Sequence, residues 1–226
     1  MYIWNQIDTK LFMAFSTKEK IDNLSKIEQI ATQRGVEYLV HFTPLIFLPQ
    51  ILNEGLFSRT KLRTEKPGRF IPVDEYRYDK KPSRISLSIT FPNNKMFYIK
   101  RRDSINLIDK DKWAILALDS KILWELDCQF FPINAATGSS IKTSDSYSSE
   151  FFYQMFSNTN SIPSHLTADV QAEVMVKDYI PPEYIKSIIV ENAQAKKICM
   201  ETCKTSIEII INKQFFGYRK NFIANL

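Results

Sequence analysis

The chain of 226 residues is 44% hydrophobic and 13% aromatic, which excludes a disordered or fibrous protein and is enough to build a sizeable core. Its length favours a single domain over residues 1–226. Lys and Arg number 30 against 25 Asp and Glu, and the resulting net charge of +5 favours an anionic partner without identifying it.

The first predicted element is a helix over residues 16–34. Ser16 and Glu19 have the spacing of a capping box, an apolar stripe follows at helical spacing, and Gly35 is placed to end the helix. We therefore expect residues 1–35 to form an N-terminal helical extension and residues 36–211 to form the core.

A buried strand and a short helical region come next. Residues 37–42 are an apolar run typical of a strand. Thr43 and Pro44 then have the residue types of an N-cap and a first helical position, which predicts one or two short helices ending at Gly55. From residue 58 to 84, basic and turn residues predict a long excursion over the surface.

The rest of the chain mixes strands and helices without a regular βαβ alternation, which favours the α+β class. Residues 95–100 have no firm assignment, residues 137–149 are rich enough in Ser and Thr to predict a mobile loop, and residues 157–170 are polar and irregular. The predicted strands span residues 85–91, 113–118, 172–176, 185–191 and 206–211, and the predicted helical segments span residues 120–125, 150–156 and 193–203.

The five glycines exclude two common nucleotide sites. They stand apart at positions 35, 55, 68, 138 and 217, so neither GxGxxG nor GxxxxGK[ST] occurs. Both motifs need clustered glycines to bring backbone N–H groups onto phosphate, which argues against a Rossmann site and a P-loop. GxSxG is also absent, which argues against an α/β-hydrolase.

The cysteines and the apolar runs bear on compartment and metal binding. Cys128, Cys199 and Cys203 form no even disulfide framework, so we expect a reducing, cytoplasmic compartment. Cys199 and Cys203 share a helix face, but CxxxC without a second paired element is a weak metal pattern, and no metal is expected. No signal peptide and no run of 18 apolar residues is seen, so no membrane span is expected.

The positive charge is concentrated in one segment. Residues 59–102 carry thirteen Lys or Arg and four Asp or Glu, a net charge of +9, whereas the remaining residues carry 17 and 21. Six aromatic residues are interleaved with these charges, an arrangement that suits the phosphates and bases of a single-stranded nucleic acid. A solvated basic loop without special function is the alternative.

Two polar residues lie within or beside apolar strands. His41 is either a hydrogen-bonded core residue or a ligand-binding residue facing a cleft, with Thr43 beside it. Glu173 begins a hydrophobic strand directly after a polar loop, a position from which it could stabilise positive charge in a cleft. Gln171 projects to the same side as Glu173, because strand side chains alternate with period two.

Five segments, in order along the chain, point to one family. They are YLVHFTPLIFLPQILNEGLFSR (38–59), DEYRYD (74–79), ISLSITFPNNKMFY (85–98), WAILALDSKILWELDCQFFPINAA (113–136) and QAEVMVKDYIPPEYIKSIIV (171–190). Together they resemble the DarT toxins, which use NAD⁺ to ADP-ribosylate a base of single-stranded DNA. The resemblance implies an ADP-ribosyltransferase-like split two-sheet β core with peripheral helices.

The resemblance also implies roles for the NAD⁺-binding and catalytic residues. Glu173 matches the glutamate that would bind the ribose hydroxyl, stabilise the ribosyl cation and help deprotonate the attacking base. His41 and Thr43 match the position that anchors the adenosine side or its ribose. Arg77 is the best match to the arginine that holds the pyrophosphate, with Arg84 and Arg69 as rivals.

Further positions follow from the same resemblance. The polar loop before Glu173 corresponds to the substrate-recognition loop of the class, and Gln171 would read the target base, which must be unstacked to be reached. Met96 and Tyr98 match positions that line the nicotinamide pocket. Asn134-Ala135-Ala136 matches a family segment whose role is not assigned. The residues expected to contact DNA are Gln171, Arg84, Lys100 and Arg101.

Two departures separate this chain from part of the family. Phe47 stands where the family often has Asn, so one contact there is lost or replaced. The strand ISLSITFPN differs from the DYVPFYF-like strand of the thymine-modifying branch and is closer to the guanine-modifying branch, which we therefore favour.

The resulting hypothesis is a monomeric, metal-independent toxin that uses NAD⁺ on single-stranded DNA and is paired with a macrodomain antitoxin of the DarG type. Two alternatives remain: a transferase of the same fold that acts on RNA or protein, and a non-catalytic nucleic-acid-binding module in which Glu173 is only structural.

Overall fold

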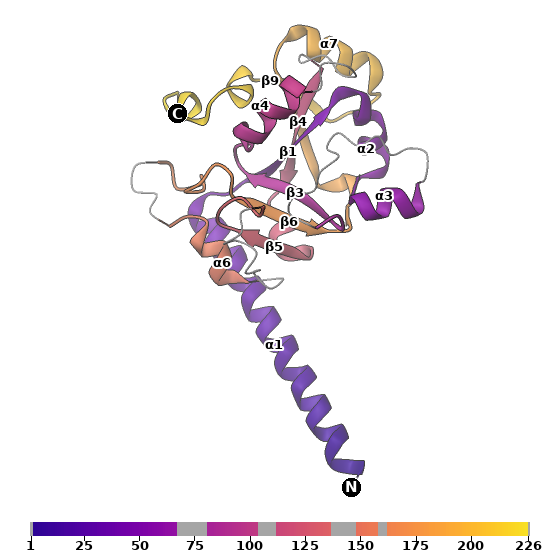
Figure 1. The fold of residues 1–226 in the computed structure, drawn as a ribbon, viewed down its shortest axis with the longest axis vertical. Coiled ribbons are helices and arrows are strands. Elements are labelled where there is room, and N and C mark those ends of the chain that lie inside the picture. Colours follow the sequence, from indigo (N-terminus) through magenta and orange to yellow (C-terminus); the bar gives the residue numbers. More distant parts are fainter. Residues whose placement is uncertain (1, 67–80, 104–111, 137–147, 158–161, 226) are drawn as a thin grey trace.

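A seven-stranded sheet in the order β5-β6-β3-β1-β4-β8-β9 forms the centre of the described part of the chain (Figure 1). The computed structural model describes residues 2–66, 81–103, 112–136, 148–157 and 162–225, with side chains from Lys18 onward. Neighbouring strands are antiparallel except β8 and β9, and β2 and β7 form a separate two-stranded sheet. The strands are β1 (Tyr38–Pro44), β2 (Leu56–Phe57), β3 (Arg84–Ile89), β4 (Trp113–Asp119), β5 (Cys128–Phe131), β6 (Glu173–Lys177), β7 (Tyr179–Ile180), β8 (Ile185–Val190) and β9 (Glu208–Ile211).

Helices surround this sheet, and α1 extends far beyond it (Figure 1). The helices in the described residues are α1 (Tyr2–Arg34), α2 (Leu48–Glu54), α3 (Arg59–Glu65), α4 (Asn94–Asp103), α5 (Ile122–Glu125), α6 (Ser149–Gln154), α7 (Ala193–Thr202) and α8 (Arg219–Ile223), with short 3₁₀ helices η1 (Leu45–Phe47), η2 (Pro182–Tyr184) and η3 (Lys213–Phe216).

The predicted start of the first helix was wrong and its end was right. The helix begins at Tyr2 and passes through Ser16, so the capping-box pattern of Ser16 and Glu19 does not mark its first turn. Gly35 has φ of 71° and ends the helix, with its N–H bonded to the Thr32 carbonyl and the Val36 N–H bonded to the Ala31 carbonyl. This pair of bonds is a Schellman C-cap, which favours glycine because of the positive φ.

The prediction that Thr43 and Pro44 begin a helix was wrong. Both residues lie in β1, which pairs with β4 from Tyr38 opposite Asp119 to Pro44 opposite Trp113. Pairing along the whole strand outweighs the local helix-start pattern, and η1 begins one residue later, at Leu45.

Other elements refine the sequence prediction. The unassigned residues 95–100 lie in α4, and part of the predicted surface excursion forms α3. The short strands β2, β5 and β7 and the C-terminal helix α8 were not predicted. Residues 67–80, 137–147 and 158–161, which form parts of the three expected loops, lie outside the described residues.

The two faces of the sheet carry different cores. On the first face, alternate strand residues such as Leu39, Leu87, Leu116 and Val174 join a mainly aliphatic cluster with α1, α2, α5, α6 and α7. On the second face, Val40 and Ile115 pack with residues of α4 and of the C-terminal segment in a cluster rich in aromatic rings.

The sheet divides between β1 and β3. These strands pair at only two positions, Leu39 opposite Ile89 and Val40 opposite Ser88, although both strands continue beyond them. The pairing therefore ends next to His41, which separates a β5-β6-β3 half from a β1-β4-β8-β9 half. This division corresponds to the split core that the family resemblance implies.

Candidate active site

One residue, Ser86, connects the two halves of the sheet at this division. His41 Nδ1 lies 3.0 Å from the Ser86 carbonyl oxygen, across the break between β1 and β3. The Ser86 hydroxyl donates a hydrogen bond to Glu173 Oε2 at 3.1 Å, across to β6. The two residues singled out from the sequence are therefore bridged by a single serine, and they come together where backbone pairing stops.

Glu173 is a buried carboxylate at the first residue of β6. Its side chain is 8% exposed, and its partner in β5 is Phe131. Val174 and Val176 face the first core, so period-two alternation directs Glu173 and Met175 to the other face, on the same side as Ser86. A carboxylate in such a setting interacts strongly with a nearby cation because water screens it little.

His41 is held in one tautomer by its neighbour. A carbonyl oxygen only accepts hydrogen bonds, so Nδ1 carries the hydrogen, and in the neutral ring Nε2 is the acceptor. Thr43 lies on the same side of β1 as His41, two residues further on, and is 5% exposed. The core and ligand interpretations of His41 are thus compatible, since the hydrogen bond that satisfies one nitrogen orients the other.

Ser86 was not predicted as a site residue, although one feature of the sequence pointed to it. In ISLSITF the apolar residues alternate with Ser86 and Ser88, which places two hydroxyls on one side of β3. The Ser88 hydroxyl accepts a hydrogen bond from the Asn93 N–H at 3.1 Å, and the Asn93 side chain accepts one from the Met96 N–H at 3.1 Å. These bonds attach the beginning of α4 to the strand that carries Ser86.

Met96 and Tyr98, both expected at the nicotinamide pocket, lie in helix α4. Met96 is half-buried and Tyr98 is 59% exposed. A helix turns about 100° per residue, so these two side chains point in nearly opposite directions. Their assignment to the nicotinamide pocket was based on their place in the sequence and stays a prediction.

Gln171, the expected DNA-reading residue, precedes β6 and faces α4. Lys95 Nζ donates to Gln171 Oε1 at 3.1 Å, and the Gln171 N–H donates to Asp169 Oδ1 at 2.7 Å. Because an ammonium only donates, the lysine fixes which end of the amide is the oxygen. The NH₂ group, a donor, is therefore the end of Gln171 that is directed away from Lys95.

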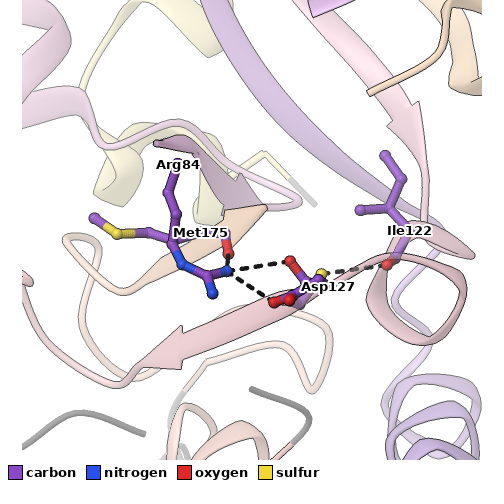
Figure 2. Close-up of polar contacts among 5 residues, drawn as sticks. Arg84, Ile122, Asp127 and Met175 are labelled. Carbon is purple, nitrogen blue, oxygen red and sulfur yellow. Dashed lines mark hydrogen bonds and ion pairs between the residues drawn. The ribbon is translucent and has the colours of Figure 1, made fainter. Parts of the chain in front are cut away.

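Arg84 has an extensive set of contacts inside the protein (Figure 2). Its Nη1 donates to the Asp127 carbonyl at 3.2 Å, to Asp127 Oδ1 at 3.0 Å and to the Met175 carbonyl at 3.1 Å. Its side chain is 11% exposed. The guanidinium thus joins β3, β6 and the segment before β5, which argues against Arg84 as a phosphate or DNA contact.

Arg101 also has partners within the protein. Lys100, the preceding residue of α4, is half-buried. Arg101 Nη2 pairs with Glu191 Oε2 at 2.5 Å, and its guanidinium lies over the rings of Phe97 and Phe216. These contacts argue against Arg101 as a DNA contact, because binding phosphate would require breaking them.

The remaining candidates differ in what the structure describes. Arg77 and Arg69, the candidate pyrophosphate residues, lie outside the described residues. In Asn134-Ala135-Ala136, the Asn134 side chain accepts from the Ala136 N–H at 2.8 Å, and Ala135 packs with Phe131 and Met175 beside the start of β6. That segment is therefore a turn that supports the strand of Glu173.

Comparisons with known proteins identify the family. A family profile described as "DarT: ssDNA thymidine ADP-ribosyltransferase, DarT" matches residues 40–217, which is most of the chain. The chain belongs to the DarT family. The resemblance seen in the sequence is thereby confirmed for the family, which consists of NAD⁺-dependent ADP-ribosyltransferases acting on single-stranded DNA. No curated protein sequence matches the chain.

Solved structures share the fold. The Thermosipho africanus DarTG in complex with ADP-ribose is 17% identical, with a TM-score of 0.59, over 80% of this chain and 51% of that one. The Thermus sp. 2.9 DarT in complex with carba-NAD⁺ is 13% identical, with a TM-score of 0.59, over 80% of this chain and 98% of that one. For that protein in complex with ADP-ribosylated ssDNA, the identity is 12% and the TM-score 0.57, over 81% and 97%. The α+β prediction is confirmed, and this chain spans about half of the Thermosipho chain.

Within the described residues, no group of three or more His, Cys, Asp and Glu side chains is arranged to bind a metal ion. Across the same residues, every helix is too short or too polar to cross a lipid bilayer.

Proposed function

We propose that this protein transfers ADP-ribose from NAD⁺ to a base of single-stranded DNA and releases nicotinamide. The observation that carries the proposal is the Glu173–Ser86–His41 connection at the division of the sheet, in a chain of the DarT family. It connects a buried carboxylate on β6 and an oriented imidazole on β1 through β3, the strand between them, and the reaction needs one such group at each end of a dinucleotide.

The reaction breaks the bond between ribose C1′ and the nicotinamide nitrogen. Nicotinamide leaves with the electron pair, and the ribose becomes oxocarbenium-like. Glu173 stabilises that positive charge and accepts a hydrogen bond from a ribose hydroxyl. A base nitrogen then attacks C1′, and the proton it loses passes to Glu173 or to water.

The other residues bind and orient. Nε2 of His41 accepts a hydrogen bond from a hydroxyl on the adenosine side, which Thr43 adjoins. Arg77 holds the pyrophosphate, with Arg69 as its rival, because Arg84 has a structural set of partners. Met96 contacts nicotinamide, and Gln171 donates to an acceptor on the target base.

Guanine is the favoured target, with thymine as the alternative. The support is the strand ISLSITFPN, which is closer to the guanine-modifying branch, although the description of the family profile names thymidine. A NH₂ donor at Gln171 suits acceptors on either base, so Gln171 itself does not discriminate.

We also propose that the protein is a monomeric, cytoplasmic toxin whose mark is removed by a macrodomain antitoxin of the DarG type. The support is the family and the Thermosipho DarTG chain, of which this chain spans about half. Co-expression with such a macrodomain should restore growth to cells that express the chain, and should not do so when the macrodomain is inactive.

The experiment that tests the activity is mass spectrometry of oligonucleotides after incubation with protein and NAD⁺. Single-stranded DNA with guanine as the only reactive base is expected to gain one ADP-ribose, whereas thymine-only DNA, duplex DNA, RNA and protein acceptors are not. A mark on thymine-only DNA would move the target to thymine. Modification of RNA or protein alone would replace the acceptor class, and the absence of a thermal shift with NAD⁺ would favour a non-catalytic binding module.

A further inference from the structure

The loop that leads to Glu173 is attached to several other parts of the protein, among them the end of β3, the end of α6 and α8. The Thr90 hydroxyl at the end of β3 donates to the His165 carbonyl at 3.1 Å, and the Ala168 N–H donates to the Met155 carbonyl after α6 at 2.8 Å. The third attachment comes from Arg219 in α8. The loop over residues 162–172 is therefore a fixed element, in contrast to the irregular segment that its sequence suggests.

Arg219 is a buried arginine bound to the backbone of this loop. Its side chain is 9% exposed, and its Nη2 donates to the Thr167 carbonyl. Burial lowers the pKa of the Arg219 guanidinium, and the negative charge of Asp169 opposes that shift. Among the described residues, Nε has no hydrogen-bond partner. Burying a guanidinium with so few hydrogen-bond partners costs free energy, which indicates that Arg219 has a role beyond packing.

A chain of hydrogen bonds leads from Arg219 toward the site. The hydroxyl of Thr167 donates to the Asp169 carbonyl at 2.7 Å, and the Asp169 carboxylate accepts from the Gln171 N–H at 2.7 Å. Glu173 is two residues further on. The Arg219 guanidinium is therefore bonded to a short turn with internal hydrogen bonds. This turn leads to Gln171 and Glu173, which are expected to contact the target base and the ribose.

Arg219 lies just outside the family match, which ends at residue 217. We propose that Arg219 is a positioning residue for acceptor recognition: by holding the Thr167–Gln171 turn, it places the Gln171 amide where the target base is bound. The inference rests on the proposed function, and it extends the working site to the C-terminal helix α8.

The test compares Arg219→Met with Arg219→Lys and with Lys220→Met, a control at the exposed neighbouring position of the same helix. Steady-state transfer is measured separately against oligonucleotide and against NAD⁺. Arg219→Met is expected to raise the KM for the oligonucleotide at least tenfold while the NAD⁺ thermal shift stays at the wild-type value. Arg219→Lys should recover part of the loss, and Lys220→Met should resemble wild type.

Amide hydrogen exchange supplies a readout that does not depend on activity. Arg219→Met should accelerate exchange at Ala168 and Gln171 and leave the β4 amides protected. Asp169→Ala removes the bond from the Gln171 N–H and keeps the bond from Arg219 to the Thr167 carbonyl. It is expected to raise the oligonucleotide KM in the same way, and it decides the matter if Arg219→Met does not fold.

Two results would overturn the inference: an unchanged oligonucleotide KM in these variants, or a loss shared equally by the KM values for oligonucleotide and NAD⁺. Wild-type protein that transfers to no oligonucleotide would instead contradict the proposed function itself.

Discussion

The two faces of the central sheet differ in composition because they do different work. The first face is a large aliphatic cluster, closed by helices, that contains residues such as Leu39 and Leu116. The second face is aromatic over the β1-β4-β8 half and polar over the β3-β6 half, where Ser86 and Glu173 lie. A buried carboxylate reduces stability unless it is well bonded, so Glu173 marks the polar half of the second face as part of the functional site.

The largest expected effect comes from removing the charge on the polar face. Glu173→Gln keeps the size of the side chain and an acceptor for the Ser86 hydroxyl, but it removes the charge that stabilises the ribosyl cation. We expect the rate of ADP-ribose transfer to fall by about 10²–10³-fold. The measurement is single-turnover transfer from labelled NAD⁺.

Two controls separate chemistry from folding in that experiment. The melting temperature of Glu173→Gln should stay close to that of wild type. Ser86→Ala, which removes only the hydrogen bond to Glu173, should lower the rate by about tenfold. A fully active Glu173→Gln variant would end the assignment of Glu173 as the catalytic residue.

Next in size is a cavity on the aliphatic face. Ile188 is fully buried in β8 within the aliphatic cluster, and Ile188→Ala should lower the free energy of unfolding by about 2–5 kcal/mol. Urea denaturation measures this loss. At a temperature where the variant remains folded, its KM for NAD⁺ should equal that of wild type, because β4 separates β8 from the strand that carries His41. A changed KM for NAD⁺ with no loss of unfolding free energy would contradict the structural role of the aliphatic cluster.

A smaller effect is expected at the Arg84 contacts (Figure 2). Arg84→Met removes the donor to Asp127 and to the Met175 carbonyl and should cost about 1–3 kcal/mol of unfolding free energy. If Arg84 is structural, the KM for the oligonucleotide should be unchanged in the folded variant. A rise in that KM comparable to the effect of Arg77→Met would restore Arg84 as a DNA or pyrophosphate contact.

The smallest effect concerns the cysteines, all three of which are buried on the aliphatic face. Burial raises the pKa of Cys199 to about 12, with a further contribution from Cys203. At pH 8 only about one Cys199 thiol in ten thousand is therefore ionised, and the thiolate is the form that reacts. Native protein should resist iodoacetamide, whereas urea-unfolded protein should be labelled at every cysteine; rapid labelling of the native form would show that this face opens.

Much of the fold followed from local pattern. The period-two alternation of β3 and the apolar runs of β1, β4 and β8 predicted those strands within one or two residues. The short strands β2, β5 and β7 were missed because two to four residues carry too little periodicity to be recognised. Helix α4 was not predicted either. Its start depends on a contact that is distant in sequence, because the N–H of Asn93, whose side chain caps the helix, is bonded to Ser88 in β3.

The candidate site divides in the same way. Glu173 and His41 could be selected because a charged or titratable residue in an apolar strand is conspicuous in a sequence. Arginines in a basic segment look alike, so the pattern could not tell that Arg84 and Arg101 have internal partners. Ser86 is an ordinary residue in sequence and matters only because two strands meet on either side of it.

The sequence alone determined the composition of the two faces, the α+β class and the family, because alternation, residue type and motif order are local properties. The tertiary structure decided where β1 and β3 stop pairing, which arginines are engaged inside the protein, and how α8 reaches the loop before Glu173. Those features depend on residues that are distant along the chain, and their positions are set by the register of the sheet and the packing of helices against it.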